Sequence, residues 1–136
     1  MLHRTKKKCD ANEGKWIGIG GAFEEGESPE ECIRREIFEE TSLVPEKLKF
    51  RGIVTFVSDR YETEYMHLFT CFSQSEKVSS CEEGELKWVS KDKINSLNLW
   101  EGDKIFLCDI LNSRDSFKFY RLCYDENDNL IAGGEE

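Results

Sequence analysis

The hydrophobic and polar positions along the chain predict both strands and helices. Stretches rich in β-branched and aromatic residues, bounded by turn-forming residues, predict strands at residues 1–4, 48–57, 64–72, 86–89, 117–124 and 130–131. Helices are predicted at residues 29–41, at 90–97, and from the segment 98–103 through about residue 111. The glycine-containing end of the chain, residues 133–136, is expected to fray.

The helix at residues 29–41 has the clearest start signal in the chain. Ser28 is a favourable N-cap, because its hydroxyl can accept a hydrogen bond from a free backbone N–H of the first turn. Pro29 follows at the first helical position, where a missing N–H costs nothing. Glu31, three residues after Ser28, completes a capping box. The sequence therefore predicts that the helix begins at residue 29.

This helix has an acidic stripe beside its apolar face. Glu36, Glu39 and Glu40 are three and four residues apart, so their side chains share one side of the helix, next to Ile33 and Ile37. Like charges at this spacing repel, and a divalent cation such as Mg²⁺ or Mn²⁺ would remove that penalty. A solvated acidic face is the alternative for a glutamate-rich helix. The glycine-rich loop directly before the helix favours a site.

That loop and helix together resemble the signature of the Nudix hydrolases, in which a glycine, a glutamate and an Arg-Glu-rich helix recur at fixed spacings. The matching residues are Gly21, Glu27, Arg35, Glu36, Ile37, Glu39, Glu40 and Leu43. Ser42 stands where the family has a glycine with positive φ, so we expect a slightly strained helix end there.

The resemblance implies an α+β fold in which a mixed β-sheet lies between α-helices, with the signature forming a loop–helix–loop. It also implies that residues 1–136 form a single Nudix domain. Family members usually have another strand before the position at which this chain begins, so we expect the first strand of the family to be missing.

The resemblance also implies a metal site and catalytic groups. Mg²⁺, with Mn²⁺ as the alternative ion, would be bound by the carbonyl of Gly20 and by four carboxylates: Glu36, Glu39, Glu40 and Glu85. Glu83 is the alternative to Glu85 in the acidic loop. Glu36, Glu40 or the loop glutamate would act as the base, and the family leaves this choice open. Arg35 would orient neighbouring carboxylates, and Glu27 would brace the loop.

Five residues are candidates for substrate binding: Arg4, Lys15, Ile17, Trp100 and Asp103. Arg4 or Lys15 would contact phosphate, because Ala22 stands where many relatives have a lysine. The resemblance places Ile17 near the base and implies base contacts for Trp100 and Asp103. Two structural alternatives stay open: Trp100 as a core residue, and Asp103 as a favourable charge at a helix N-terminus.

Composition narrows the class of protein. The net charge of −9 argues against nonspecific nucleic-acid binding, which needs a basic face. No apolar run is long enough to span a membrane, and no signal peptide is recognisable. The six cysteines form no Cys-x-x-Cys pair, which argues against zinc. We therefore expect reduced thiols in a cytoplasmic protein.

The resemblance extends beyond the signature. Residues 15–21, 51–57, 64–69 and 98–103 are similar to the 8-oxo-dGTP diphosphatases of the family. This implies metal-dependent hydrolysis of a nucleoside triphosphate to the monophosphate and pyrophosphate, a nucleotide-pool function that protects DNA. One alternative is another Nudix substrate: an unmodified nucleotide, a dinucleoside polyphosphate or a nucleotide sugar. The other is a non-catalytic nucleotide-binding module. The sequence makes no prediction of oligomeric state.

Overall fold

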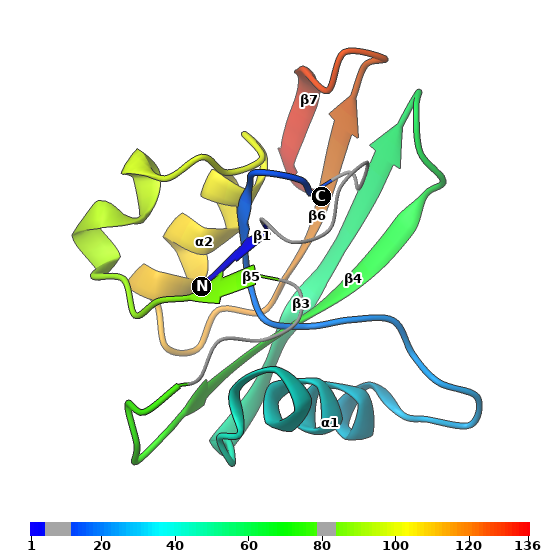
Figure 1. Ribbon diagram of the computed structural model, residues 1–136. Helices are drawn as coiled ribbons and strands as arrows, with labels where there is room; N and C mark the ends of the chain where they lie inside the picture. Colours follow the sequence, from blue (N-terminus) through cyan, green and yellow to red (C-terminus); the bar gives the residue numbers. More distant parts are fainter. Residues whose placement is uncertain (5–11, 79–83) are drawn as a thin grey trace. The chain divides into compact units, whose positions relative to one another are not determined.

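The computed structural model describes residues 1–4, 12–78 and 84–136, so the alternative metal ligand Glu83 lies outside the described residues. These residues fall into two compact units (Figure 1): Met1–Lys47 with Cys71–Leu99, and Leu48–Thr70 with Trp100–Glu136. None of the helices in these described ranges has the length and apolar character needed to cross a membrane.

The first unit contains a small antiparallel sheet centred on β1 (Leu2–Arg4), with β2 (Trp16–Ile17) on one side and β5 (Gly84–Leu86) on the other. Leu2 is fully buried, opposite both Ile17 and Leu86. The strand predicted at residues 1–4 is confirmed. The strand predicted at 86–89 is wrong in its limits, because Trp88 is exposed and its indole donates to the Glu76 carbonyl at 2.8 Å.

Helix α1 (Pro29–Thr41) has the predicted limits. The Ser28 hydroxyl accepts a hydrogen bond from the Glu31 N–H at 3.2 Å, as the capping box predicts. At the other end, Ser42 has a φ of 61°, and its N–H donates to the Phe38 carbonyl at 2.8 Å. The strained helix end is therefore confirmed.

The second predicted helix, at residues 90–97, is a single short 3₁₀ segment, η1 (Lys91–Ser96). Ser90 occupies its N-cap position but makes no side-chain hydrogen bond there. The segment ends after about two turns of three residues each.

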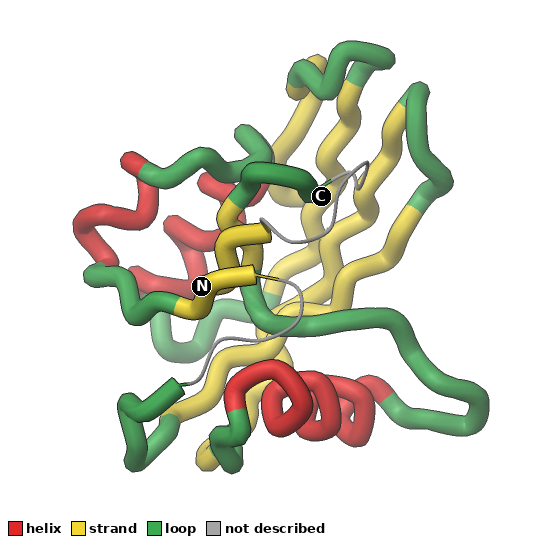
Figure 2. The backbone as a smooth tube through the Cα atoms, viewed as in Figure 1, coloured by secondary structure: helices red, strands yellow, loops and turns green. Residues whose placement is uncertain are grey.

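The second unit is built on a four-stranded sheet in the order β4 (Glu64–Phe72), β3 (Glu46–Ser58), β6 (Lys118–Tyr124) and β7 (Leu130–Glu135). Figure 2 shows its strands in yellow. β3 and β6 run parallel, and β6 and β7 run antiparallel. Gly52 on β3 has a φ of 139°, and a Cβ there would collide with the Lys118 carbonyl on β6. A glycine is therefore required at this point of the parallel pair.

The core of this unit is largely aromatic. Tyr120, Leu122 and Tyr124 alternate along β6 and are almost fully buried. Trp100 packs edge-on against Tyr124 at 4.9 Å between ring centroids. The Tyr124 hydroxyl accepts a hydrogen bond from the Gly102 N–H at 2.7 Å, immediately before α2 (Asp103–Asn112). The predicted helix therefore exists, and its first residue is Asp103.

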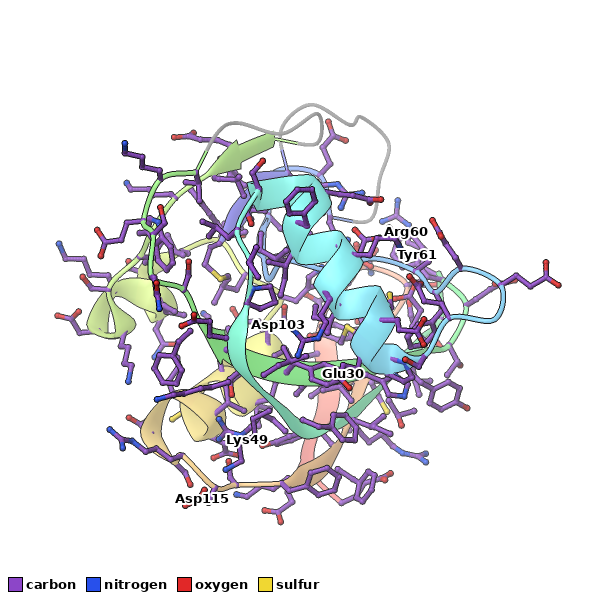
Figure 3. The ribbon with its side chains drawn as sticks, turned by 90° about the horizontal axis from the view of Figure 1, so that it is seen from below. Glu30, Lys49, Arg60, Tyr61, Asp103 and Asp115 are labelled. Carbon is purple, nitrogen blue, oxygen red and sulfur yellow. The ribbon has the colours of Figure 1, made fainter. Side chains whose placement is uncertain are left out.

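A buried arginine fixes the other end of α2. Arg51 is 3% exposed, and its guanidinium donates to the Ile110, Ser113 and Ser116 carbonyls and to two hydroxyls. A cation is favourable at a helix C-terminus, where carbonyl groups lack partners within the helix. Two residues before Arg51, Lys49 pairs with Asp115 (Figure 3).

The end of the chain corrects one prediction. Residues 133–136 are not frayed, because β7 continues to Glu135 and pairs with β6 through Gly133, opposite Leu122. The Glu136 N–H donates to the Phe119 carbonyl at 2.8 Å, and its carboxylate pairs with Arg121 at 2.7 Å. Compositional signals for fraying were overridden by strand pairing in the folded unit.

The two helix ends allow a matched stability test. A left-handed conformation costs a non-glycine residue about 1–2 kcal/mol of strain. Glycine avoids this strain but lowers stability by about 0.5–1 kcal/mol, because it has more conformational freedom to lose on folding. We expect Ser42→Gly to raise the free energy of unfolding by about 0.5–1 kcal/mol. Ser113 caps α2 with an extended φ of −133°, so Ser113→Gly should lower it. Denaturant unfolding measures both; equal shifts would contradict the strain at Ser42.

Candidate active site

The centre of the site is an ion pair between α1 and the loop before it. Arg35 contacts both oxygens of Glu27: Nε lies 2.6 Å from Oε1, and Nη2 lies 3.0 Å from Oε2. Two-point contacts of this kind fix orientation as well as distance. Glu27 also accepts the Glu24 N–H at 2.9 Å. Arg35 thus ties the loop to the helix, and Glu27 braces the loop as the sequence predicted.

This pairing shifts the titration of both groups. The hydrogen bonds from Arg35 are the main cause that lowers the pKa of Glu27 from 4.5 to about 2, and the Glu24 N–H adds to the effect. The bond to Glu27 in turn raises the pKa of Arg35. Both side chains are therefore charged across the physiological pH range.

Arg35 also contacts the acidic stripe of α1. Its Nη1 lies 2.9 Å from Oε1 of Glu36 and 3.1 Å from Oε2 of Glu39. Its Nη2 donates to the Ala22 carbonyl at 3.1 Å. A cation between two carboxylates reduces their mutual repulsion, which explains how the helix tolerates this stripe.

Two adjacent loop residues, Gly20 and Gly21, contact the carboxylates of α1, and the approach at Gly21 is close enough to require glycine. A Cβ at Gly21 would collide with the carboxylate of Glu36, so only glycine permits this contact. The Gly20 N–H donates to Oε2 of Glu40 at 3.2 Å, and Glu40 is only 8% exposed. The sequence predicted a role for the Gly20 carbonyl; the structure adds that its N–H holds Glu40 in place.

Cys32 is part of the site, and the sequence reasoning missed it. The side chain is buried, and its thiol donates to the Gly21 and Ala22 carbonyls at 3.7 and 3.6 Å. Burial raises its pKa, so it stays a neutral thiol. Its position three residues before Arg35 was the available signal, since that spacing puts both side chains on the side that meets the loop.

The carboxylates suit a hard divalent cation in their chemistry. Within residues 1–4, 12–78 and 84–136, no group of three or more His, Cys, Asp or Glu side chains is arranged to hold a metal ion. Arg35 contacts one oxygen of Glu36 and one oxygen of Glu39, and the Gly20 N–H contacts Oε2 of Glu40. These donors are all carboxylate oxygens, so their chemistry fits Mg²⁺ or Mn²⁺.

The other predicted residues of the first unit lie on its small sheet. Glu85 is exposed on β5, opposite His3. The Arg4 N–H donates to the Lys15 carbonyl at 2.9 Å, which places these two basic residues next to each other. Ile17 is half-buried on β2, opposite Leu2.

Trp100 and Asp103 belong to the second unit. Trp100 is 5% exposed, with its ring edge-on to Phe56 and Tyr124, as its structural alternative predicted. Asp103 is the half-buried first residue of α2, where a carboxylate complements the helix dipole (Figure 3). Their base contacts stay predictions.

The shifted pKa of Glu27 gives a test of the ion pair. A carboxylate with a depressed pKa stabilises the fold above its ordinary pKa of 4.5, and this contribution is lost as the pH falls to about 2. We expect Glu27→Gln to lower the free energy of unfolding at pH 7, with the deficit shrinking across that window. Urea unfolding at several pH values measures it.

The control is Glu30→Gln, which breaks a solvent-exposed pair between Glu30 and Arg34 on the same helix (Figure 3). Exposed ion pairs on a helix contribute about 0.3–0.5 kcal/mol, so Glu30→Gln should change the free energy of unfolding only slightly at every pH. A Glu27→Gln deficit that does not depend on pH would contradict the assignment.

Three comparisons bear on this geometry. A family profile described as NUDIX domain matches residues 1–110. The Nudix hydrolase YvcI of Bacillus subtilis is 34% identical over 96 residues, which cover 66% of this chain and 60% of that protein. This chain therefore spans less than two thirds of the length of that relative. The oxidized purine nucleoside triphosphate hydrolase of Danio rerio is 29% identical over a stretch that covers 85% of this chain and 74% of that protein.

The solved structure of the MutT protein from Bacillus halodurans matches in three dimensions, with a TM-score of 0.78 and 26% identity. The match covers 99% of this chain and 87% of that one. The profile spans most of the chain, and the structure supplies the loop–helix contacts that the signature residues make. The chain therefore belongs to the Nudix hydrolase family.

Proposed function

We propose that this chain hydrolyses a nucleoside triphosphate, with 8-oxo-dGTP as the substrate to test first, to the monophosphate and pyrophosphate. The observation that carries the proposal is the arrangement around Arg35. One guanidinium contacts Glu27, Glu36 and Glu39, while two glycines hold the backbone against Glu36 and Glu40. A solvated acidic face would not need this close approach between loop and helix.

Two relatives support the choice of substrate. The Danio rerio protein is named for hydrolysis of oxidized purine nucleoside triphosphates, and the matching Bacillus halodurans structure is a MutT protein. A chain with this activity would act on free nucleotides in the cytoplasm, before they enter DNA. The net charge of −9 supports a small-molecule substrate over nucleic acid.

The proposed cofactor is Mg²⁺, with Mn²⁺ as the substitute. Its ligands would be one backbone carbonyl and four carboxylates: Gly20, Glu36, Glu39, Glu40 and Glu85. When bound, a divalent cation of this kind neutralises phosphate charge and lowers the pKa of the attacking water.

The remaining chemistry falls to the protein's own side chains. Glu36, Glu40 or Glu85 would accept the proton of the attacking water, and Arg35 would hold the neighbouring carboxylates in orientation. Arg4, with its planar guanidinium, and Lys15, with its compact ammonium group, would bind phosphate oxygens. Ile17, Trp100 and Asp103 would contact the base.

The burial of Trp100 favours a second candidate. A ring that is 5% exposed offers little surface for stacking on a purine. This observation supports a Nudix hydrolase that acts on a different nucleotide, such as an unmodified triphosphate, a dinucleoside polyphosphate or a nucleotide sugar.

A substrate panel tests the proposal. With Mg²⁺ present, 8-oxo-dGTP, dGTP, a dinucleoside polyphosphate and a nucleotide sugar would each be assayed for monophosphate and pyrophosphate. We expect Glu40→Gln to lower kcat by about 10²-fold or more, because it removes a charge from the site. The glutamine oxygen can still accept the Gly20 N–H, so melting temperature should change little.

The matched control is Glu31→Gln, which removes a charge from the first turn of the same helix. Its kcat should stay close to that of the wild type. Wild-type kcat in Glu40→Gln at saturating Mg²⁺ would contradict the assigned site, and inactivity on the whole panel would contradict the proposed function.

Base selection gives a separate prediction. Asp103→Asn exchanges a pure acceptor for a mixed donor and acceptor at nearly constant volume. If Asp103 contacts the base, the ratio of kcat/KM for 8-oxo-dGTP to that for dGTP should change by about tenfold, the effect of one hydrogen bond of about 1.4 kcal/mol. Trp100→Ala, which damages the core, should lower both values together and reduce stability. A constant ratio in Asp103→Asn would leave Asp103 as a helix-dipole residue.

A further inference from the structure

Two side chains converge on one backbone carbonyl at the start of the glycine-rich segment. The Asn98 amide donates to the Gly14 oxygen at 3.0 Å, and Nε2 of His3 lies 3.1 Å from the same oxygen. Because a carbonyl oxygen only accepts hydrogen bonds, Nε2 of His3 carries the hydrogen. We call these three residues the Gly14 clamp.

The clamp also fixes Trp16. The Asn98 carbonyl accepts the Trp16 N–H at 2.9 Å, so Asn98 contacts the segment on both sides of Lys15. The His3 ring stacks on the Trp16 ring, with centroids 4.6 Å apart and planes 9° from parallel. β2 has only two residues and two register pairs with β1. The Arg4 backbone adds one hydrogen bond to Gly14 and one to Lys15, and the clamp supplies the side-chain contacts to this segment.

The consequence for the proposed site follows from strand geometry. Successive side chains of an extended segment point to opposite faces. With Trp16 held against His3 on one face of β2, Ile17 lies on the other face, and Lys15 directly precedes the strand. Both Lys15 and Ile17 are proposed substrate contacts. Three residues after Ile17, the same segment reaches Gly20, whose N–H contacts Glu40.

We propose that Asn98, acting with His3 through the Gly14 carbonyl, is a positioning residue that sets Lys15 and Ile17 for substrate binding. This rests on the proposed hydrolysis of a nucleoside triphosphate. The two side-chain hydrogen bonds of the clamp both go to the Gly14 carbonyl and not to a carboxylate of α1, so we expect the clamp to act on substrate binding and not on the chemical step.

The test is Asn98→Asp, which keeps the size of the side chain but sets an acceptor against the Gly14 oxygen. KM for the triphosphate should rise about 3- to 10-fold, the effect expected for one hydrogen bond, while kcat stays within about twofold. Asn98→Gln, which keeps the amide donor, should recover part of the loss. Asn112→Asp is the matched control, because Asn112 donates to the Cys108 carbonyl at 2.9 Å on α2. Its KM should not change.

A double-mutant cycle separates positioning from general stability. If Asn98 acts through Ile17, then Ile17→Ala should raise KM less in the Asn98→Asp background than in the wild type. Additive effects, an unchanged KM in Asn98→Asp, or an equal fall in kcat would each overturn the proposal.

Hydrogen exchange at residues 12–17 gives a readout that needs no turnover. Exchange there should be faster in Asn98→Asp than in the wild type or in Asn112→Asp. If the wild type hydrolyses nothing in the panel, the proposed function is wrong. Hydrogen exchange then remains as the test of whether the Gly14 clamp holds residues 12–17. Unchanged exchange would overturn it.

Discussion

The bidentate ion pair between Arg35 and Glu27 is the interaction on which the site depends. A loop rich in glycine has many accessible conformations, and ordering it costs backbone entropy. The pair fixes that loop at Glu27, and the same guanidinium donates to the Ala22 carbonyl five residues earlier. The loop between these two points has little freedom left. Gly20 and Gly21 thereby reach the carboxylates of Glu40 and Glu36.

The same arginine resolves the electrostatic problem of the helix. Acidic side chains at helical spacing destabilise one another, and Glu36 and Glu39 share the single cation of Arg35. Arg35 therefore offsets part of the repulsion within the acidic stripe.

A second arginine, Arg51, also joins several segments of its unit, but through different partners. Arg51 is buried and donates to carbonyls at the end of α2 and to hydroxyls, and none of its hydrogen-bond partners in the described residues is a carboxylate. In that setting the charge satisfies backbone groups that the end of the helix leaves free. The family signature marked Arg35 in the sequence, whereas no sequence pattern marked Arg51, whose role comes from what surrounds it in the folded chain.

The sequence by itself determined the local features. Ser28, Pro29 and Glu31 specify where α1 begins, because a capping box acts between neighbours in the chain. The spacing of Gly21, Glu27, Arg35 and the glutamates identified the family, and Ser42 in place of glycine predicted the strained helix end. Most of the long strands were likewise predicted within two residues of their limits.

Only the tertiary structure decided which distant groups meet. Residues 133–136 have the composition of a loose end, yet pairing with β6 orders them as far as Glu135. Trp100 is 5% exposed, packed against Phe56 and Tyr124 from separate strands. The contacts of Asn98 with Gly14, 84 positions away, follow no local rule. Such contacts depend on how the chain folds back on itself, and no spacing along the sequence encodes them.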